Sequence, residues 1–196
     1  MPAPNLEDAA KYLYEIGQLK RVRRSGWWIA GIDHPESVAE HSFRTAVIGY
    51  VLAHLAGADL HKVATMCLFH DAHETRLNDV HRIARRYLPW GDAGERAAAD
   101  QAARLPESAA KELTDFFRSW ESPDSLEAQL ARDADQLECL VQAREYQAQG
   151  HKDVQDWIDG CRAALKTDVA QALADECLRL EPSAWWQGLK VGKATG

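Results

Sequence analysis

The chain has 196 residues, of which 46% are hydrophobic and 27% charged. This length and balance are typical of one globular domain and exclude a disordered protein. The net charge of −7 argues against a general nucleic-acid binder, because such proteins are usually basic. The N-terminus has no signal pattern, and no apolar run reaches the roughly 18 residues of a membrane helix. We expect a cytoplasmic protein without a membrane or nucleic-acid polymer as partner.

The first helix is expected over residues 6–20, with one apolar side formed by Leu13, Ile16 and Leu19. Residues 19–28 then carry four cations, a turn and two tryptophans. This segment is either a solvated basic patch beside a half-buried tryptophan or a substrate clamp. In a clamp, an arginine would grip phosphate and an indole would offer a flat apolar face to a base or sugar.

A second helix is expected to begin after Ser37, because Glu40 follows at the spacing of a capping box. Gly57 would end it. His41 lies in its first turn, where a lone histidine is more often a surface or satisfied core residue than a metal ligand. The apolar stripe of this helix is expected to be Val47, Ile48, Val51, Leu52 and Leu55.

An apolar helix over residues 60–74 runs into His70 and Asp71. Packing alone does not explain this pair, because both side chains lose hydration when buried and need partners. A divalent metal is such a partner for imidazole and carboxylate groups. On a continuing helix, Glu74 would lie on the same side about one turn further on, where it could act as a general acid or base.

The next segment, residues 76–89, is polar and then helical, and it brings Asp79, His81 and several arginines close after the His-Asp pair. One interpretation is an exposed amphipathic turn. The other is a second wall of the pocket, in which His81 or an arginine such as Arg82 binds phosphate.

Further helices are expected over residues 93–103, 106–120, 126–149 and 157–180. The third of these carries Asp133 and Asp135, and Trp185-Trp186 is expected to fold back onto the body. No segment alternates convincingly with a period of two, so the fold class is predicted to be all-α. The four cysteines form no CxxC pair and are interpreted as reduced residues within the fold: Cys67, Cys139, Cys161 and Cys177.

The order His41, His70-Asp71, Asp135 on three predicted helices resembles that of the HD-domain metal-dependent phosphohydrolases. Residues 17–44, which include PESVAEHS at 35–42, and residues 134–146 resemble the branch of the 5′-deoxynucleotidases. The match covers about residues 6–150. The resemblance implies a single helical HD domain over 1–196, with its core at about 6–150 and a C-terminal helix and tail at 151–196.

The resemblance also implies roles for individual residues. A divalent ion (Co, Mn, Ni, Fe, Zn or Mg) would be held by His41, His70, Asp71 and Asp135; Asp133 occupies a variable slot. Glu74 would assist attack by water, and Asp79 would lie near the sugar. Arg24 and Trp27 match the family's arginine and tryptophan that bind the substrate. From the basic segment 76–89 itself, His81 and Arg82 are added as candidate substrate-binding residues.

The function implied is removal of phosphate from (deoxy)nucleoside 5′-monophosphates. After Glu74, however, the branch usually continues with an apolar run and Gly-Asp, whereas residues 75–82 here are more basic. Extra cations could hold a longer phosphate chain, so triphosphate hydrolysis of a (deoxy)nucleoside triphosphate is one alternative. A non-catalytic nucleotide-binding protein is another. A homodimer is expected from the resemblance alone.

Overall fold

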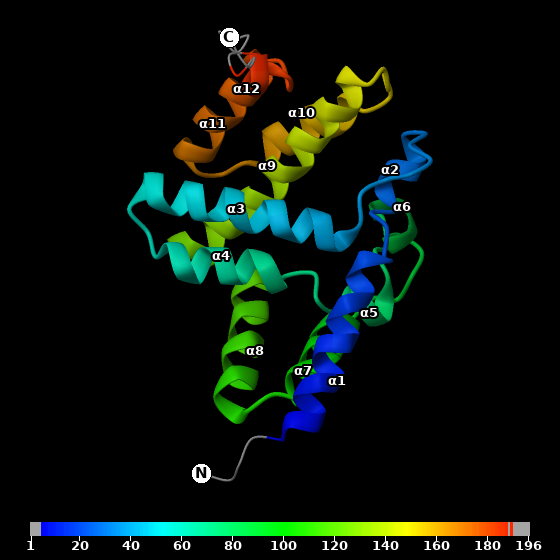
Figure 1. The fold of residues 1–196 in the computed structure, drawn as a ribbon, viewed down its shortest axis with the longest axis vertical. Coiled ribbons are helices and arrows are strands. Elements are labelled where there is room, and N and C mark those ends of the chain that lie inside the picture. The colour runs from blue at the N-terminus through cyan, green and yellow to red at the C-terminus, as the bar shows by residue number, and fades with distance from the viewer. Residues whose placement is uncertain (1–4, 188, 190–196) are drawn as a thin grey trace, which may run out of the picture.

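The computed structural model describes residues 5–187 and 189. Its regular elements in this part of the chain are helices, and the nearest approach to a strand is one isolated bridge between Arg23 and Ser37. The all-α prediction is confirmed (Figure 1). None of the described helices is long and apolar enough to cross a bilayer.

Three helices form the centre of the molecule: α3 (Val38–Ala56), α4 (Leu60–Phe69) and α9 (Leu126–Ala148). Each packs against the other two, and α9 also packs against α10 (Gln155–Ala164) and α11 (Asp168–Arg179). In Figure 1, α10 and α11 lie above α3, and α1, α7 and α8 extend below α4. The remaining elements are α1 (Leu6–Ile16), the 3-10 helix η1 (Gly17–Lys20), α2 (Gly26–Ile29), α5 (Glu74–Leu77), α6 (Arg82–Arg85), α7 (Ala93–Ala102), α8 (Glu107–Glu121) and α12 (Ala184–Gln187).

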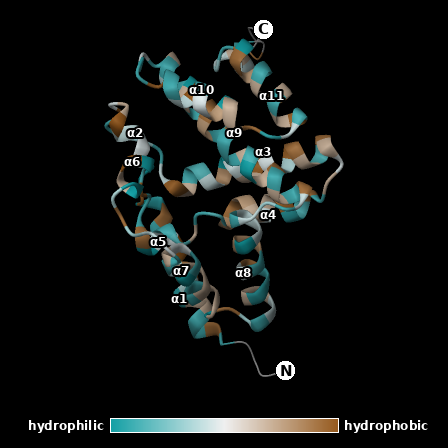
Figure 2. Ribbon diagram, turned by 180° about the vertical axis from the view of Figure 1, so that it is seen from behind, coloured by the Kyte–Doolittle hydropathy of each residue, from teal (hydrophilic) through white to brown (hydrophobic). Residues whose placement is uncertain are grey.

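The largest core cluster is organised around α9, whose Leu130, Leu137 and Leu140 are at most 1% exposed. Each such leucine contributes roughly 1.5–3 kcal/mol by leaving water. Val154 and Ile158, near and on α10, belong to the same cluster. Figure 2 shows the mixed hydropathy along the helices that surround this core. All four cysteines are free thiols, as predicted.

Helix α3 begins as the sequence predicts. Ser37 and Glu40 form the reciprocal capping box, and Gly57 ends the helix in the left-handed conformation at φ 70°. The predicted apolar stripe is only partly correct, since Leu52 is buried but Val47 and Leu55 are 48% and 59% exposed. The packed side of α3 includes Gly49, where an added Cβ would lie 2.6 Å from the Cys67 sulfur of α4. The close contact between α3 and α4 is therefore made at a glycine, which a pattern of large apolar residues does not reveal.

Two predicted helices are interrupted in the structure. The helix expected over 60–74 ends at Phe69, and α5 starts separately at Glu74. The helix expected over 157–180 is broken around Thr167 into α10 and α11. The break is fixed from outside, because the Asp133 carboxylate of α9 accepts hydrogen bonds from the backbone N–H groups of Lys166 and Thr167 and from the Thr167 hydroxyl. Such a long-range cap leaves no local pattern in the sequence.

Some side chains lie differently from their predicted positions. Leu13 is 71% exposed, because α1 turns Tyr12 inward instead. Trp185 and Trp186 are 75% and 45% exposed, so the prediction that they fold back onto the body is wrong for the described residues. They belong to the single turn of α12, which buries none of its side chains.

Candidate metal centre and substrate pocket

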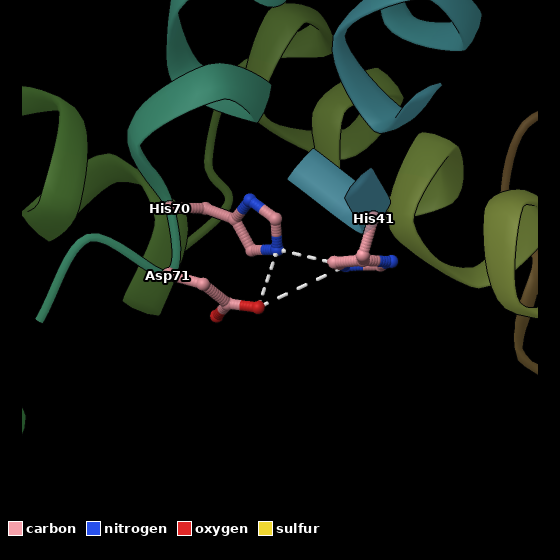
Figure 3. Close-up of side chains that lie close together, drawn as sticks. All are labelled: His41, His70 and Asp71. Atoms are coloured by element: carbon pink, nitrogen blue, oxygen red, sulfur yellow. Dashed lines mark hydrogen bonds and ion pairs between the residues drawn. The ribbon is translucent and has the colours of Figure 1, made fainter. Parts of the chain in front are cut away.

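Two histidines and an aspartate meet where α3 begins and α4 ends (Figure 3). The Nε2 atoms of His41 and His70 lie 3.3 Å apart. One carboxylate oxygen of Asp71 lies 3.0 Å from Nε2 of His70 and 3.8 Å from Nε2 of His41. Three ligand atoms of the kind that bind divalent ions therefore surround one point.

Helix α9 brings Asp135 to the same point. Its Oδ1 lies 3.2 Å from Nε2 of His41 and 3.9 Å from Nε2 of His70. Asp133, two residues earlier, binds the break between α10 and α11 instead. The four side chains that the sequence singled out as ligands thus converge from three helices and a loop, and the preference for Asp135 over Asp133 agrees with their positions.

The outer nitrogens of both imidazoles are occupied. Nδ1 of His70 lies 2.6 Å from the carbonyl oxygen of Cys67, and Nδ1 of His41 lies 2.5 Å from a carboxylate oxygen of Glu138. Both partners accept, so we assign the ring proton to Nδ1 in each case. The lone pair of each Nε2 then faces the centre, as it does in histidines that bind metals.

The donor set fits a divalent cation. Two imidazole lone pairs that face each other with two carboxylates beside them repel one another unless a positive charge lies between them. Burial and the Arg24 charge lower the pKa of His41, but the carboxylates of Glu138 and Asp135 outweigh them and raise it to about 10. Without an ion, a proton on His41 supplies the missing positive charge; with one, the metal takes that place.

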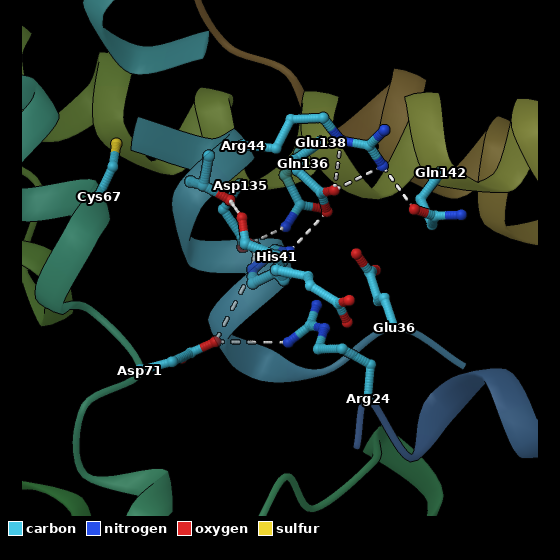
Figure 4. A network of polar contacts seen from close by, with 12 residues as sticks. Arg24, Glu36, His41, Arg44, Cys67, Asp71, Asp135, Gln136, Glu138 and Gln142 are labelled. Atoms are coloured by element: carbon cyan, nitrogen blue, oxygen red, sulfur yellow. Dashed lines mark hydrogen bonds and ion pairs between the residues drawn. The ribbon is translucent and has the colours of Figure 1, made fainter. Parts of the chain in front are cut away.

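A second layer of polar contacts supports His41 (Figure 4). Arg44 donates from Nε to Glu138 at 2.8 Å and from its other nitrogens to Glu145 and Gln142 at 2.7 and 2.6 Å. Burial raises the pKa of Glu138, but the charges of His41 and Arg44 lower it overall, so the carboxylate stays ionised. Sequence reasoning gave Arg44 and Glu138 no role. Glu138 lies three residues after Asp135, and this helical spacing was the available signal.

Arg24 and Asp79 are held beside the candidate ligands. The guanidinium of Arg24 lies 3.4 Å from the carboxylate of Asp71. The backbone N–H of Arg24 donates to the carbonyl oxygen of Glu36. Asp79 accepts the backbone N–H of Ser25 at 2.6 Å and, through its carbonyl, the Ser25 hydroxyl at 2.7 Å. Asp79 therefore ties the loop after α5 to the turn that carries Arg24.

Glu74 begins α5 and does not continue α4, so the helical argument for its position is wrong although it does line the same cavity. The side chain is 1% exposed, and Oε2 has no hydrogen-bond partner in the described residues. Burial, and then the neighbouring charges of Asp71 and Asp79, raise the pKa of Glu74 well above its usual value. Such a carboxyl group holds its proton more tightly than an exposed glutamate does, which is typical of functional sites.

Trp27 does not present an open indole face. It is 2% exposed, its N–H donates to Glu36 at 3.1 Å, and its ring packs against Tyr146 and Trp157. Only part of its side chain reaches the cavity. The segment 19–28 thus combines the two interpretations considered from the sequence, since Arg24 faces the site while Trp27 supports the wall.

Three of the four candidate ligands, His70, Asp71 and Asp135, line a cavity of about 1010 Å³. His81, Arg82 and Arg85 form its basic wall. His81 also caps α6, since its Nδ1 accepts the backbone N–H of Ala84. Sequence reasoning gave no role to His73, another lining residue, which is 8% exposed and whose Nδ1 has no partner in the described chain. Its position in the lining depends on contacts with α7 and α8, which leave no local pattern around residue 73.

Comparison with known proteins agrees with this arrangement. A family model described as HD domain matches residues 16–176. The chain belongs to the HD domain family. The human 5′-deoxynucleotidase HDDC2 is 32% identical over 152 residues, which cover 76% of this chain and 74% of the human protein. The Saccharomyces cerevisiae 5′-deoxynucleotidase YBR242W is 30% identical over 178 residues, which cover 85% of this chain and 71% of the yeast protein. Membership of the family, predicted from the sequence motifs, is confirmed.

Solved structures share the fold. A conserved hypothetical protein from Pyrococcus furiosus superposes with a TM-score of 0.75 at 29% identity, covering 87% of this HD-family chain and 99% of its own. The HD phosphohydrolase DatZ of cyanophage S-2L, described with dA and one catalytic Zn²⁺, gives a TM-score of 0.51 at 19% identity and covers 85% and 91%. The second likeness concerns the fold alone. With its HD-family relatives, the chain is a hydrolase.

Proposed function

We propose that this chain removes the phosphate group from (deoxy)nucleoside 5′-monophosphates. The observation that carries the proposal is the convergence of four imidazole and carboxylate ligands beside an arginine, within one cavity. The names of the relatives, 5′-deoxynucleotidases of 29–32% identity in human and Dictyostelium, support the substrate class.

We propose His41, His70, Asp71 and Asp135 as the ligands of a divalent ion. When bound, such an ion lowers the pKa of water and draws charge from phosphoryl oxygens. Nitrogen and oxygen ligands suit Co, Mn, Ni, Fe or Zn and are less typical of Mg, so the donor set does not select one metal. Because zinc binds both imidazole and carboxylate ligands, Zn²⁺ is a suitable first ion to test.

The protein groups would divide the remaining work. Arg24 would bind the phosphate and offset its charge, since its side chain is 19% exposed and already beside Asp71. Glu74 would orient water or move its proton. Asp79 would hold the turn of Arg24 and lie near the sugar, and His81 and Arg82 would contact substrate from the basic wall.

The test measures the products released from nucleotides by metal-stripped and metal-restored protein. We expect inorganic phosphate from monophosphates, with activity that depends on the restored ion. Release of tripolyphosphate from triphosphates would favour the alternative that the basic wall suggests. Nucleotide binding without turnover under every metal would instead indicate a binding protein.

His70→Ala and His61→Ala make a matched pair for this test. His70 lies at the convergence point, whereas the His61 side chain is exposed at the start of α4. We expect His70→Ala to abolish the metal-dependent activity and His61→Ala to retain it. Equal loss in both variants would contradict the assignment of His70.

We also propose a homodimer, as the resemblance implies. Helix α3 leaves a run of apolar side chains on its outer side that are 39–68% exposed: Phe43, Val47, Tyr50, Val51 and Leu55. A face of this kind is suited to contact between copies. Val47→Glu should convert the dimer to a monomer in sedimentation experiments without loss of helix. The cytoplasmic location stays a prediction.

A further inference from the structure

The cavity has a second wall that carries little charge. It is formed by Gly26, by Cys139 of α9 and by Trp157 and Cys161 of α10. A hydrogen bond with Cys161, and then burial, raise the pKa of the Cys139 thiol well above its usual value, so this thiol is uncharged at neutral pH. Among the residues of α10 that line the cavity, Asp156 is charged, and its side chain is exposed to solvent. We call Gly26, Cys139, Trp157 and Cys161 the uncharged wall.

Trp157 is the large side chain of this wall. Its ring lies 5.8 Å from that of Trp27 at an interplanar angle of 30°. Trp27 is fixed in turn by its contact with Tyr146 and its hydrogen bond to Glu36. Trp157 therefore lines the cavity on a rigid support, which keeps the entropic cost of binding low.

The indole N–H of Trp157 makes no hydrogen bond with any described residue. Nε1 is 3.9 Å from the point that a Cβ on Gly26 would occupy. A glycine at this position leaves open the space next to the donor. Tryptophan N–H groups that leave water usually find an acceptor, and here a bound ligand would supply one.

From this arrangement, and resting on the proposed function, we propose that the uncharged wall binds the nucleobase and that the Trp157 N–H donates to an acceptor on it. Arg24 fixes the phosphate end of the substrate near Asp71. The nucleoside then extends along a wall of the cavity, and the basic wall and the uncharged wall both border it. A neutral aromatic base gains more from the indole and the thiol than from the hydrated arginines of the basic wall, which suit additional phosphates.

The test compares Trp157→Phe with Trp90→Phe, because Trp90 lines the cavity near the basic wall, 4.8 Å from the guanidinium of Arg85. Binding of a deoxynucleoside monophosphate is measured by calorimetry on metal-loaded protein that also carries Glu74→Gln, so that turnover is suppressed. We expect Trp157→Phe to raise the Kd roughly 3- to 10-fold, the effect of losing one hydrogen bond. Trp90→Phe should leave it unchanged, and neither variant should alter binding of 2-deoxyribose 5-phosphate, which has no base.

Gly26→Ala is a second variant that leaves Trp157 in place. The added methyl group would be in ordinary van der Waals contact with the indole nitrogen, so the fold should be kept while the donor is shielded. We expect the Kd to rise for the nucleotide but not for the sugar phosphate. Trp185→Phe, on the exposed turn of α12, serves as a control for tryptophan removal.

An unchanged nucleotide Kd in both Trp157→Phe and Gly26→Ala would overturn the proposal, as would a rise confined to Trp90→Phe. Equal weakening of nucleotide and sugar phosphate would also overturn it, since the base would then not be the group recognised. Failure of the proposed function is a separate result. In that case the parent protein binds the nucleotide and the wall variants weaken it, but phosphate is not released under any metal.

Discussion

The candidate metal centre and the basic wall face the same cavity, but they are built differently. At the centre, His41, His70 and Glu138 are at most 4% exposed, and the outer nitrogens of both imidazoles are fixed by hydrogen bonds. On the basic wall, Arg82 and Arg85 belong to the single turn of α6 and are exposed. Buried and paired groups hold a precise geometry, whereas exposed arginines can adapt to the ligand. We therefore expect substitutions at the centre to have larger effects than those on the wall.

The strongest way to break this comparison is a substitution among the candidate ligands. Asp135→Asn should lose the bound metal and about 10³-fold or more in activity, because a metal contributes several kcal/mol to such a reaction. Asp133→Asn is the matched control on the same helix. It should keep the metal and lower the free energy of unfolding by about 1–3 kcal/mol, since Asp133 only joins α9 to the break before α11. Metal analysis and denaturant unfolding measure the two effects.

Glu74→Gln should lower kcat by about 10²- to 10⁴-fold, the usual contribution of a general acid or base. Its metal content should be unchanged, because the carboxylates that pair with Nε2 of His41 and His70 are those of Asp71 and Asp135 and not that of Glu74. Metal analysis beside steady-state kinetics checks both expectations. Loss of the ion in this variant would instead place Glu74 among the ligands.

Glu138→Gln tests whether the contact behind His41 matters. The neutral amide can no longer balance His41 and Arg44, so metal affinity should fall about 10- to 100-fold. Titration of stripped protein with Zn²⁺ measures the affinity. Glu145→Gln, which changes a half-exposed partner of Arg44, should have a much smaller effect. Similar losses in both variants would indicate that the helix is disturbed as a whole.

Arg82→Ala addresses the basic wall directly. The Arg82 side chain is exposed and forms no ion pair with a described residue. Exposed charges usually contribute little, so the substitution should change kcat/KM for a monophosphate by no more than about threefold. A much larger loss for a triphosphate would show that the basic wall binds the distal phosphates. Competition between the two nucleotides measures the difference.

An effect on stability alone is expected at the contact between Glu15 of α1 and Arg76 of α5. A hydrogen bond from Arg76 is the main cause that lowers the pKa of Glu15, and burial opposes it. Because the pKa of Glu15 is lower in the folded state, its carboxylate stabilises the fold fully at pH values above the unfolded pKa of 4.5. This contribution to stability is lost as the pH falls through the lower pKa of the folded state. Glu15→Gln should cost about 1 kcal/mol at pH 7 and nothing at the acidic end. Urea unfolding at several pH values checks this, and an equal loss at every pH would contradict it.

The sequence by itself determined the helical class, the start of α3 and the identity of the candidate ligands. The first two follow from local signals, a capping box at Ser37 and helical periodicity. The His70-Asp71 pair stands out because packing does not require it, whereas His41 and Asp135 were added as ligands through the family resemblance. The choice of Asp135 over Asp133 came from the family resemblance, and the structure gives it a physical reason, since the two carboxylates point to opposite sides of α9.

Only the tertiary structure decided which other side chains take part. The break before α11 depends on Asp133, more than thirty residues earlier, and Trp27 is covered by Tyr146 and Trp157 from distant helices. His73 and Trp157 line the cavity for the same reason. Contacts between residues far apart in the chain leave no periodic pattern, so burial and unpaired polar atoms at these positions become visible only once the helices are packed.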